Sequence, residues 1–333
     1  MTGNRTFLRL RLRLRRSALP AALAAMALLV SACGDDGGGG GGSGGKNLTL
    51  IQGVTNEPFY ITMACGAKDA ARAAGYSLSV TGPAQWDASQ QTSVVNSVTA
   101  KHPDAVLIAP VDSQAMIAPL RQMKNAGVKI VQVDTNVTDM SVGASWISSD
   151  NAAGGRLAAK SLAKLTGNHG TVLIVDVKAG TSTTDARNQG FRDELKNDPG
   201  ITVLTSQYDN DDPAKAASVV TSTLAAHPDL AGIFATNLNS TSGAATGLRQ
   251  AGKQGKVKLV GFDAEPKEIE DLKNGSVQAV VAQDPYRIGK LGVEQALKAL
   301  SGKKTTATIK TGLVTITSTD VASMSKYYYK ASC

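Results

Sequence analysis

The stretch SVVNSVTAKHPD at residues 93–104 returns 125 residues later as SVVTSTLAAHPD at residues 218–229, with eight of twelve positions identical. In each copy a helical pattern runs into a His-Pro-Asp turn, and a short apolar run follows. The correspondence resumes where LRQMKNAGVKIVQVD (120–134) matches LRQAGKQGKVKLVGFD (248–263). Two copies of so long a unit predict two similar lobes, because a solenoid would show more copies at a shorter period.

Short apolar runs alternate with helical patterns along the rest of the chain. The runs are rich in Val and Ile and apolar on both faces, which is typical of parallel strands covered on both sides. The predicted strands are LTLIQG (48–53), AVLIA (105–109), KIVQV (129–133), TVLIV (171–175), AGIFA (231–235), KLVGF (258–262) and VQAVVA (277–282). Helical patterns end at Gly75 and Gly127, and glycine is the residue type expected just past a helix. The alternation predicts an α/β fold with doubly wound parallel sheets.

The first residues form a targeting segment and not a part of the fold. Six arginines precede an unbroken apolar run, AALAAMALLV (21–30), which is too short to span a bilayer core of about 30 Å. The run ends in VSAC, which resembles the lipobox of bacterial lipoproteins, where the signal is cleaved before a cysteine that carries lipid. We therefore predict a lipoprotein signal peptide over 1–32 and lipidation of Cys33. An ordinary secretory signal and a twin-arginine signal are the alternatives.

A glycine-rich tether over residues 33–45 follows the signal peptide. The tether fits part of a phosphate loop, but Asn47 stands where that motif needs Ser or Thr, and no strand precedes it. The formal net charge of +8 falls to +2 (8 − 6) once the six arginines leave with the signal. The charge therefore gives no reason to expect a nucleic acid partner, and no helix-turn-helix pattern precedes the first strand.

Three cysteines are present. If Cys33 is lipidated, Cys65 and Cys333 remain, in an oxidising compartment outside the cytoplasm. We predict that these two form a disulfide that ties the C-terminal tail to the first helix, which is worth on the order of 5 kcal/mol in the chain-entropy model. Two free buried thiols are the alternative.

Asp134 and Asp263 each follow a predicted strand, at equivalent points of the repeat. Ligands of open α/β sheets bind beyond the carboxyl ends of the strands. Two facing lobes would present both carboxylates to one ligand, and an ionised carboxylate accepts hydrogen bonds from two hydroxyls. We therefore expect a site for a polyhydroxylated molecule. The alternative is that each aspartate caps the turn that follows it.

With these residues in place, the chain resembles the ribose-type periplasmic binding proteins, the sugar receptors of ABC importers. The resemblance runs from about residue 48 to residue 317, and its landmarks occur in the family's order and spacing. They are TNEPFY (55–60), IAPVDS (108–113), SSDN (148–151), AGTSTTDARNQGF (179–191), VGFD (260–263) and AQDPYRIG (282–289). The resemblance implies the type I periplasmic binding protein fold, with two Rossmann-like lobes joined by a three-stranded hinge. The N-terminal lobe would take 46–149 plus 284–312, and the C-terminal lobe 150–283 plus 313–333.

The resemblance also implies a site, residue by residue. Asp134 and Asp263 match the carboxylates that bind hydroxyls, in agreement with the repeat. The other matches are aromatics that stack on the sugar (Phe59, Tyr60), a cleft arginine (Arg187), two amides (Asn237, Gln283), an apolar contact (Phe262) and a weaker match near the hinge (Ser149).

The chain departs from the ribose receptors at three positions. Thr135 stands where they carry Arg, and Glu57 and Ala109 stand where they carry Asn. Lys178 also replaces an apolar contact. We therefore expect a monosaccharide other than ribose or a small sugar alcohol, with Glu57 directed either to the ligand or to solvent.

The predicted function is that of a monomeric extracytoplasmic lipoprotein, anchored to the membrane by its lipid, that delivers the sugar to an ABC permease without cofactor or metal. A sensory or quorum-signal receptor of the same fold is the alternative, and a glycosidase with paired aspartates is an alternative of another class. The histidines, at 102, 169 and 227, lie in turn-like segments. None of them is left for a nucleophile–His–acid arrangement, so we expect no enzyme.

Overall fold

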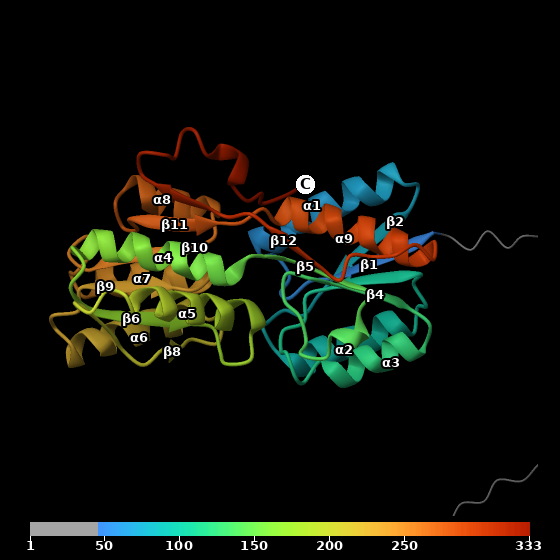
Figure 1. Ribbon diagram of the computed structural model, residues 1–333, viewed down its shortest axis with the longest axis horizontal. Coiled ribbons are helices and arrows are strands. Elements are labelled where there is room, and N and C mark those ends of the chain that lie inside the picture. Colours follow the sequence, from blue (N-terminus) through green and yellow to red (C-terminus); the bar gives the residue numbers. More distant parts are fainter. Residues whose placement is uncertain (1–45) are drawn as a thin grey trace, which may run out of the picture. The chain divides into compact units, whose positions relative to one another are not determined.

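The computed structural model describes residues 46–333, which form two β-sheets, each with helices on both faces (Figure 1). The predicted signal peptide, the lipidation site Cys33 and the tether lie outside these residues. The first sheet has the order β12-β5-β4-β3-β1-β2, and its pairings are parallel. Its strands are β1 (Asn47–Ile51), β2 (Ser77–Thr81), β3 (Ala105–Ile108), β4 (Lys129–Val133), β5 (Ser145–Ser149) and β12 (Thr308–Thr311).

The second sheet has the order β13-β11-β10-β9-β6-β7, and β8 also pairs with β6. Only β13 runs antiparallel to its neighbour among these described strands. Its strands are β6 (Gly170–Asp176), β7 (Ile201–Val203), β8 (Gln207–Tyr208), β9 (Gly232–Ala235), β10 (Lys258–Phe262), β11 (Ala279–Ala282) and β13 (Val314–Thr317).

The two sheets share one strand order, which confirms the two similar lobes predicted from the repeat. The run β2-β1-β3-β4-β5 of the first sheet corresponds to β7-β6-β9-β10-β11 of the second. In both sheets the strand order changes direction next to the strand that comes first in the sequence, β1 in the first sheet and β6 in the second. Open α/β sheets bind ligands at such switch points. Strands β3, β9 and β11 are buried along their whole length, as expected for strands covered on both faces.

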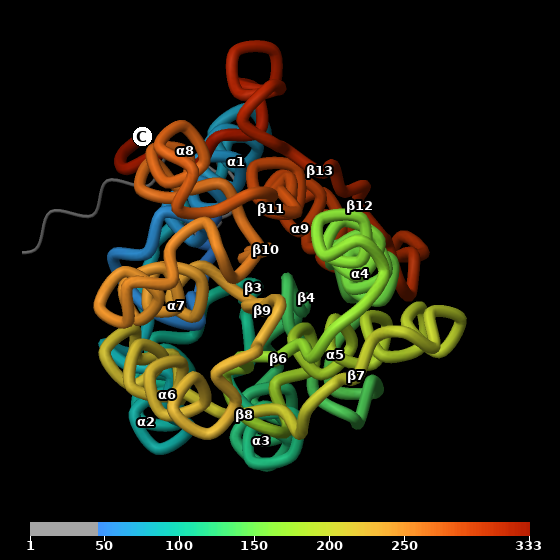
Figure 2. The backbone as a smooth tube through the Cα atoms, turned by 90° about the vertical axis from the view of Figure 1, so that its left-hand side faces the viewer, coloured from blue at the N-terminus to red at the C-terminus, as the bar shows by residue number. Residues whose placement is uncertain are grey.

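Helices cover both faces of each sheet (Figures 1 and 2). Against the first sheet, α1 packs with α9 on one face and α2 with α3 on the other. Against the second sheet, α4 packs with α5, and α6 with α7. The helices are α1 (Pro58–Ala73), α2 (Ala88–Thr99), α3 (Ile117–Asn125), α4 (Asn151–Thr166), α5 (Ser182–Leu195), α6 (Pro213–Ala226), α7 (Leu238–Gln250), α8 (Pro266–Lys273) and α9 (Pro285–Leu300), with short 3-10 turns η1 (Met140–Val142) and η2 (Ser325–Tyr327). We call the first sheet with α1, α2, α3 and α9 the first lobe, and the second sheet with α4 to α8 the second lobe.

The chain passes between the two sheets three times. The crossings lie between β5 and α4, between β11 and α9, and between β12 and β13. The strands of the first sheet fall within 46–149 and 284–312, and those of the second within 150–283 and 313–333. The domain boundaries themselves stay a prediction.

The repeated segments form the ends of α2 and α6 and the turns that lead into β3 and β9. In the first turn, His102 has a positive φ of 48°, and the Asp104 side chain accepts a hydrogen bond from the backbone N–H of Asn47 at 2.7 Å. Both turns thus lie where strands begin, at the edge opposite the strand-end aspartates. The repeat is scaffolding for the sheets and not part of a site.

Several strands lack the apolar pattern and were not expected. The β2 sequence SLSVT is partly exposed along its length, and the β5 sequence SWISS has serines at three of its five positions. Strands β7, β8, β12 and β13 are two to four residues long. The strands other than β5 lie at a sheet edge or are very short, and such segments can pair through the backbone alone, so hydrophobic patterning does not find them. Strand β5 lies inside the sheet, between β4 and β12, and its serines interrupt the apolar pattern.

The predicted disulfide is present in the structure. It joins Cys65 of α1 to Cys333, across 268 positions of the sequence. Cys65 is buried and Cys333 is exposed. The C-terminal tail, which leaves the second sheet after β13, is therefore tied to the first lobe.

Candidate functional site

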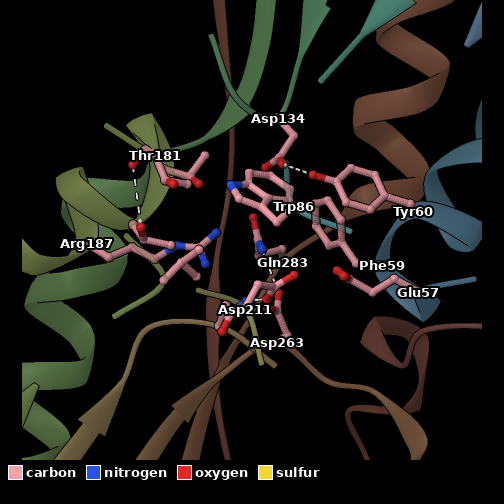
Figure 3. A pocket seen from close by; sticks show the side chains of 14 residues that line it. Glu57, Phe59, Tyr60, Trp86, Asp134, Thr181, Arg187, Asp211, Asp263 and Gln283 are labelled. Atoms are coloured by element: carbon pink, nitrogen blue, oxygen red, sulfur yellow. Dashed lines mark hydrogen bonds between the residues drawn. The ribbon is translucent and has the colours of Figure 1, made fainter. Parts of the chain in front are cut away.

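The two strand-end aspartates lie in one pocket. Asp134 follows β4 and Asp263 follows β10, and their side chains point into the same space from opposite sides (Figure 3). Both have a positive φ, 62° and 87°, which is uncommon outside glycine and turns the chain sharply at the strand end. The pocket takes residues from both lobes.

Asp134 is held by the first lobe. Its side chain is 5% exposed and accepts a hydrogen bond from the Tyr60 hydroxyl at 2.9 Å. Burial raises the pKa of Asp134 to about 6, against the opposing effects of the Arg187 charge and the Tyr60 hydrogen bond. Near neutral pH the carboxyl group is therefore an acceptor whose charge is poorly solvated, ready to bind hydroxyl donors.

Asp263 is held by two donors on one oxygen. Its Oδ1 accepts from Gln283 Nε2 at 2.6 Å and from the Tyr329 hydroxyl at 2.8 Å. Burial raises the pKa of Asp263, while Arg187 and these two hydrogen bonds act against burial. Because Oδ1 is occupied, Oδ2 is the oxygen left for further donors.

Arg187 stands between the two carboxylates. It lies on α5 with 3% of its surface exposed, and its guanidinium lies 3.7 Å from the centre of the Phe262 ring. Its Nε donates to Asn151 Oδ1 at 2.8 Å and its Nη1 to the Thr236 carbonyl at 2.7 Å. These contacts fix the planar donor fork, and its remaining N–H groups are available to the pocket.

Aromatic side chains of the first lobe form one wall of the pocket. Phe59 and Tyr60 meet edge to face at 5.1 Å between ring centres, and Tyr60 stacks with Trp86 at 6.5 Å. Gly53, just after β1, makes room for them, because a Cβ there would lie 2.4 Å from atoms of Tyr60 and Trp86. Flat aromatic faces of this kind suit the C–H faces of a ring or chain.

Further acidic groups complete the lining. Glu57 precedes α1, and burial together with the nearby carboxylates raises its pKa well above the usual value. Asp211 accepts from the amides of Asn237 at 2.6 Å and Asn239 at 3.0 Å, and burial raises its pKa to about 6. Glu57 faces the pocket, in keeping with the first of the two orientations expected for it.

Three buried polar atoms of the lining have no hydrogen-bond partner. They are Trp86 Nε1, which can only donate, Gln283 Oε1, which can only accept, and Thr181 Oγ1, which can do both. Buried polar atoms are nearly always bonded, so unpaired ones inside a pocket indicate a ligand with both donors and acceptors. Together with the carboxylates and the arginine, this chemistry fits a small molecule that carries several hydroxyl groups.

Eight of the residues predicted for the site line this pocket: Glu57, Phe59, Tyr60, Asp134, Arg187, Asn237, Asp263 and Gln283. Three others do not line it. The Phe262 ring packs against the Arg187 guanidinium, Thr135 is fully buried, and Ser149 pairs its hydroxyl with Thr311 at 3.3 Å at a crossing between the lobes.

Lys178 lies at the rim, where the two lobes meet. Its Nζ is 3.2 Å from the Asp112 carboxylate of the first lobe, so it pairs with protein instead of lining the pocket. Close by, the Asn136 N–H donates to Ser182 Oγ at 3.0 Å. These contacts between lobes mean that the cleft is closed in this structure.

Several lining residues were not predicted from the sequence. They are Trp86, Val177, Thr181, Thr183, Thr184 and Asp211. Asp211 carried a signal of its own, since it lies in the acidic run DNDD (209–212) directly after β8. Trp86 lies in the loop before α2, and a lone tryptophan in a loop gives no pattern to read.

Within residues 46–333, no group of His, Cys, Asp and Glu side chains has the arrangement of a metal site. No helix in that range combines the length and the apolar character needed to cross a membrane.

Comparisons with known proteins agree with this geometry. The model of the periplasmic binding protein domain matches residues 48–304. The ribose import binding protein RbsB of Salmonella typhimurium is 33% identical over 283 residues, which are 85% of this chain and 94% of that protein. The D-allose-binding periplasmic protein of Escherichia coli is 30% identical over 258 residues, 74% of this chain and 83% of that protein.

Solved structures are also similar. An ABC transporter solute-binding protein from Agrobacterium vitis, with bound α-D-tagatopyranose, is 40% identical and superposes with a TM-score of 0.83, covering 85% of this chain and 99% of that chain.

Proposed function

The chain belongs to the ribose-type periplasmic sugar-binding proteins of ABC importers, and on this premise we propose that it captures a monosaccharide or small sugar alcohol in the pocket between its lobes. The observation that carries the proposal is the convergence of Asp134 and Asp263, from equivalent strands of the two sheets, on one pocket with Arg187 between them. The carboxylates accept from hydroxyls, the arginine and Trp86 donate to oxygens, and the aromatic wall covers the apolar face.

The lining supports a ligand other than ribose. Glu57 adds a fourth carboxyl group to Asp134, Asp211 and Asp263, whereas Thr135 supplies no cation. Ala109, where ribose receptors have an amide, is fully buried. Carboxyl groups accept strongly from hydroxyls, so a ligand rich in hydroxyl donors, such as a hexose, a ketohexose or a polyol, is favoured. The relative of known structure that holds tagatose makes D-tagatose a probe of choice.

Delivery follows from opening and closing of the cleft. We propose that the two lobes, with the boundaries predicted above, rotate about the three crossings, as two-domain binding proteins do around their ligands. The closed, monomeric form would then dock on a permease, kept nearby by lipid on Cys33 and the tether over 33–45.

The proposal predicts that sugars stabilise the mature chain, prepared with Cys33→Ser so that it carries no lipid. In a thermal-unfolding panel of D-ribose, D-allose, D-tagatose, D-fucose, xylitol and sorbitol, at least one compound should raise the unfolding temperature. A ligand at a hundredfold excess over Kd adds about 2.7 kcal/mol to the free energy of unfolding. Trp86 lines the pocket and is one of only two tryptophans, so fluorescence should change with the same compound. Binding of none of them in calorimetry would refute the proposal.

Binding and stability should respond to pH in opposite directions. Folding raises the pKa of Asp134 and Asp211 from the usual 3.8 to about 6, so the folded state favours their protonated forms. Their contribution to stability is complete below about pH 4 and is lost as pH rises through about 6. The unliganded protein should therefore unfold at a higher temperature at pH 5 than at pH 7.5, while the sugar-induced increase shrinks at pH 5. Unfolding curves with and without sugar at both pH values measure both trends, and an unliganded protein that loses stability at pH 5 would contradict the expectation.

A further inference from the structure

The C-terminal segment crosses from one lobe to the other. Residues 318–333, which we call the strap, leave the second sheet after β13 and end at Cys333, bonded to Cys65 of α1. Figure 1 shows this red segment passing above α8 and ending beside α1. The strap is a fourth link between the lobes, and it lies beyond residue 304, where the match to the periplasmic binding protein domain ends.

One strap residue reaches the binding site. Tyr329 is 4% exposed, and its backbone N–H donates to the Ala264 carbonyl at 3.0 Å. Its hydroxyl donates to Asp263 Oδ1 at 2.8 Å and accepts from the Gln283 N–H at 3.2 Å. Tyr329 thus contacts the pocket carboxylate of the second lobe from behind, outside the space for the ligand.

The same part of the strap is fixed to the first lobe. The Tyr329 ring meets Phe59, which lines the pocket, edge to face at 5.7 Å. The next residue, Lys330, donates its N–H to Thr62 Oγ1 at 2.7 Å, and the disulfide follows three residues later. Tyr329 is therefore held between α1 and the strand end that carries Asp263.

Asp263 needs such support. Its φ of 87° is a strained conformation for a residue with a side chain, and its burial disfavours the charged form. Two donors on Oδ1 fix the carboxylate plane and leave Oδ2 free for the ligand. Without the Tyr329 hydroxyl, the side chain would keep the Gln283 amide and the weaker backbone contact from Leu238.

We propose that Tyr329 is a positioning residue for sugar binding, which orients Asp263 through its hydroxyl and is itself held in place by the Cys65–Cys333 disulfide. This inference rests on the proposed function, because it gives Tyr329 a part in binding through Asp263. It assigns a role in the site to a segment outside the matched domain.

The pH profile of binding distinguishes positioning from general stabilisation. The Tyr329 hydrogen bond lowers the pKa of Asp263, so loss of this bond should raise that pKa. As the pH falls, the variant should therefore lose affinity at a higher pH than the wild type does. The other charged or titratable groups that act on Asp263 come from α5, the loops after β4 and β8, the residue before α1, the residue before α8, and α8 itself, and each is unchanged in the variant. They are Arg187, Asp134, Asp211, Glu57, Glu265 and Glu268.

The test compares Tyr329→Phe with Tyr327→Phe, a matched strap variant whose hydroxyl lies outside the pocket. Both are made in the mature chain with Cys33→Ser, and Kd for D-ribose, D-allose and D-tagatose is measured by calorimetry from pH 5 to 8. We expect Tyr329→Phe to raise Kd about tenfold, as for a lost hydrogen bond to a charged group. The loss of affinity at acidic pH should also begin at a higher pH in this variant. Tyr327→Phe should match the wild type.

The disulfide is tested by the double variant Cys65→Ser, Cys333→Ser. We expect a rise in Kd similar to that of Tyr329→Phe, and little further loss when the three changes are combined, because both act through one hydrogen bond. If the wild type binds a sugar and Tyr329→Phe matches Tyr327→Phe in Kd and pH profile, the positioning role is refuted.

A measurement without ligand keeps the two proposals separate. If the wild type binds none of the six compounds of the panel, the proposed function loses its support, while the role of Tyr329 is still decided by the carboxyl ¹³C titration of Asp263, assigned with Asp263→Asn. A higher pKa of Asp263 in Tyr329→Phe than in Tyr327→Phe supports the positioning role, and equal values overturn it.

Discussion

Replacing Asp263 by alanine is expected to raise Kd for the bound sugar at least about a hundredfold. The variant removes a buried acceptor for ligand hydroxyls and also leaves Gln283 Nε2 and the Tyr329 hydroxyl without their acceptor. A hydrogen bond to a charged group contributes about 1.5–3 kcal/mol, so two ligand hydroxyls that lose the carboxylate as their acceptor together lose more than the 2.8 kcal/mol of a hundredfold change. Calorimetry with the strongest sugar of the panel measures the effect.

Two further variants separate the loss of the carboxylate from damage to the fold. Asp263→Asn keeps a side chain that tolerates the left-handed backbone at φ 87°, but it removes the charge and replaces one acceptor oxygen by an NH2 donor, so it should bind weakly yet unfold like the wild type. Asp229→Ala changes an exposed aspartate of the repeated turn, at the opposite edge of the sheet, and should bind normally. Normal sugar binding by Asp263→Ala would show that the pocket is not the sugar site.

The fold was predictable because the same structural unit occurs twice in the sequence. The segments 93–104 and 218–229 form the same helix–turn–strand unit in both lobes, and the strand order is the same in both sheets. Once β4 and β10 are recognised as equivalent strands, their final aspartates are placed at equivalent points of two sheets. The central strands are buried on both faces, so their continuous apolar runs could be recognised in the sequence. Edge strands such as β2 mix polar and apolar residues, and the sequence alone does not identify them as strands.

The pocket was only partly predictable, because some of its residues depend on how distant loops fold. Trp86 and Asp211 come from loops of different lobes and meet only in the folded chain. Lys178 was predicted to contact the ligand, but it pairs with Asp112 across the cleft. Neither outcome follows from spacing, since both depend on the direction of a side chain.

The C-terminal strap shows the same limit. The sequence supported the pairing of Cys65 with Cys333 by elimination, but it did not suggest that a tyrosine four residues before Cys333 would reach Asp263. That contact depends on the path of the strap between α8 and α1, for which no sequence pattern exists.

Replacing Arg187 by methionine should raise Kd at least about a hundredfold. Among the described residues that line the pocket, Arg187 is the one cation facing four carboxyl groups, and it lowers the pKa of both Asp134 and Asp263. Without it those pKa values rise, so any remaining binding should be lost at a higher pH than in the wild type. The pH dependence of Kd is the measurement.

The same variant should also lower stability, although methionine can still cover the Phe262 ring. Asn151 Oδ1 and the Thr236 carbonyl lose their buried donor, which costs about 1–3 kcal/mol for each unsatisfied group. Arg249→Met, an exposed change on α7, is the matched control and should leave both Kd and the unfolding temperature unaltered. Arg187→Lys keeps the charge without the planar fork, so partial recovery of the pH profile but not of affinity would assign the charge to the carboxylates and the fork to the sugar. Wild-type affinity in Arg187→Met would instead mean that the ligand does not contact α5.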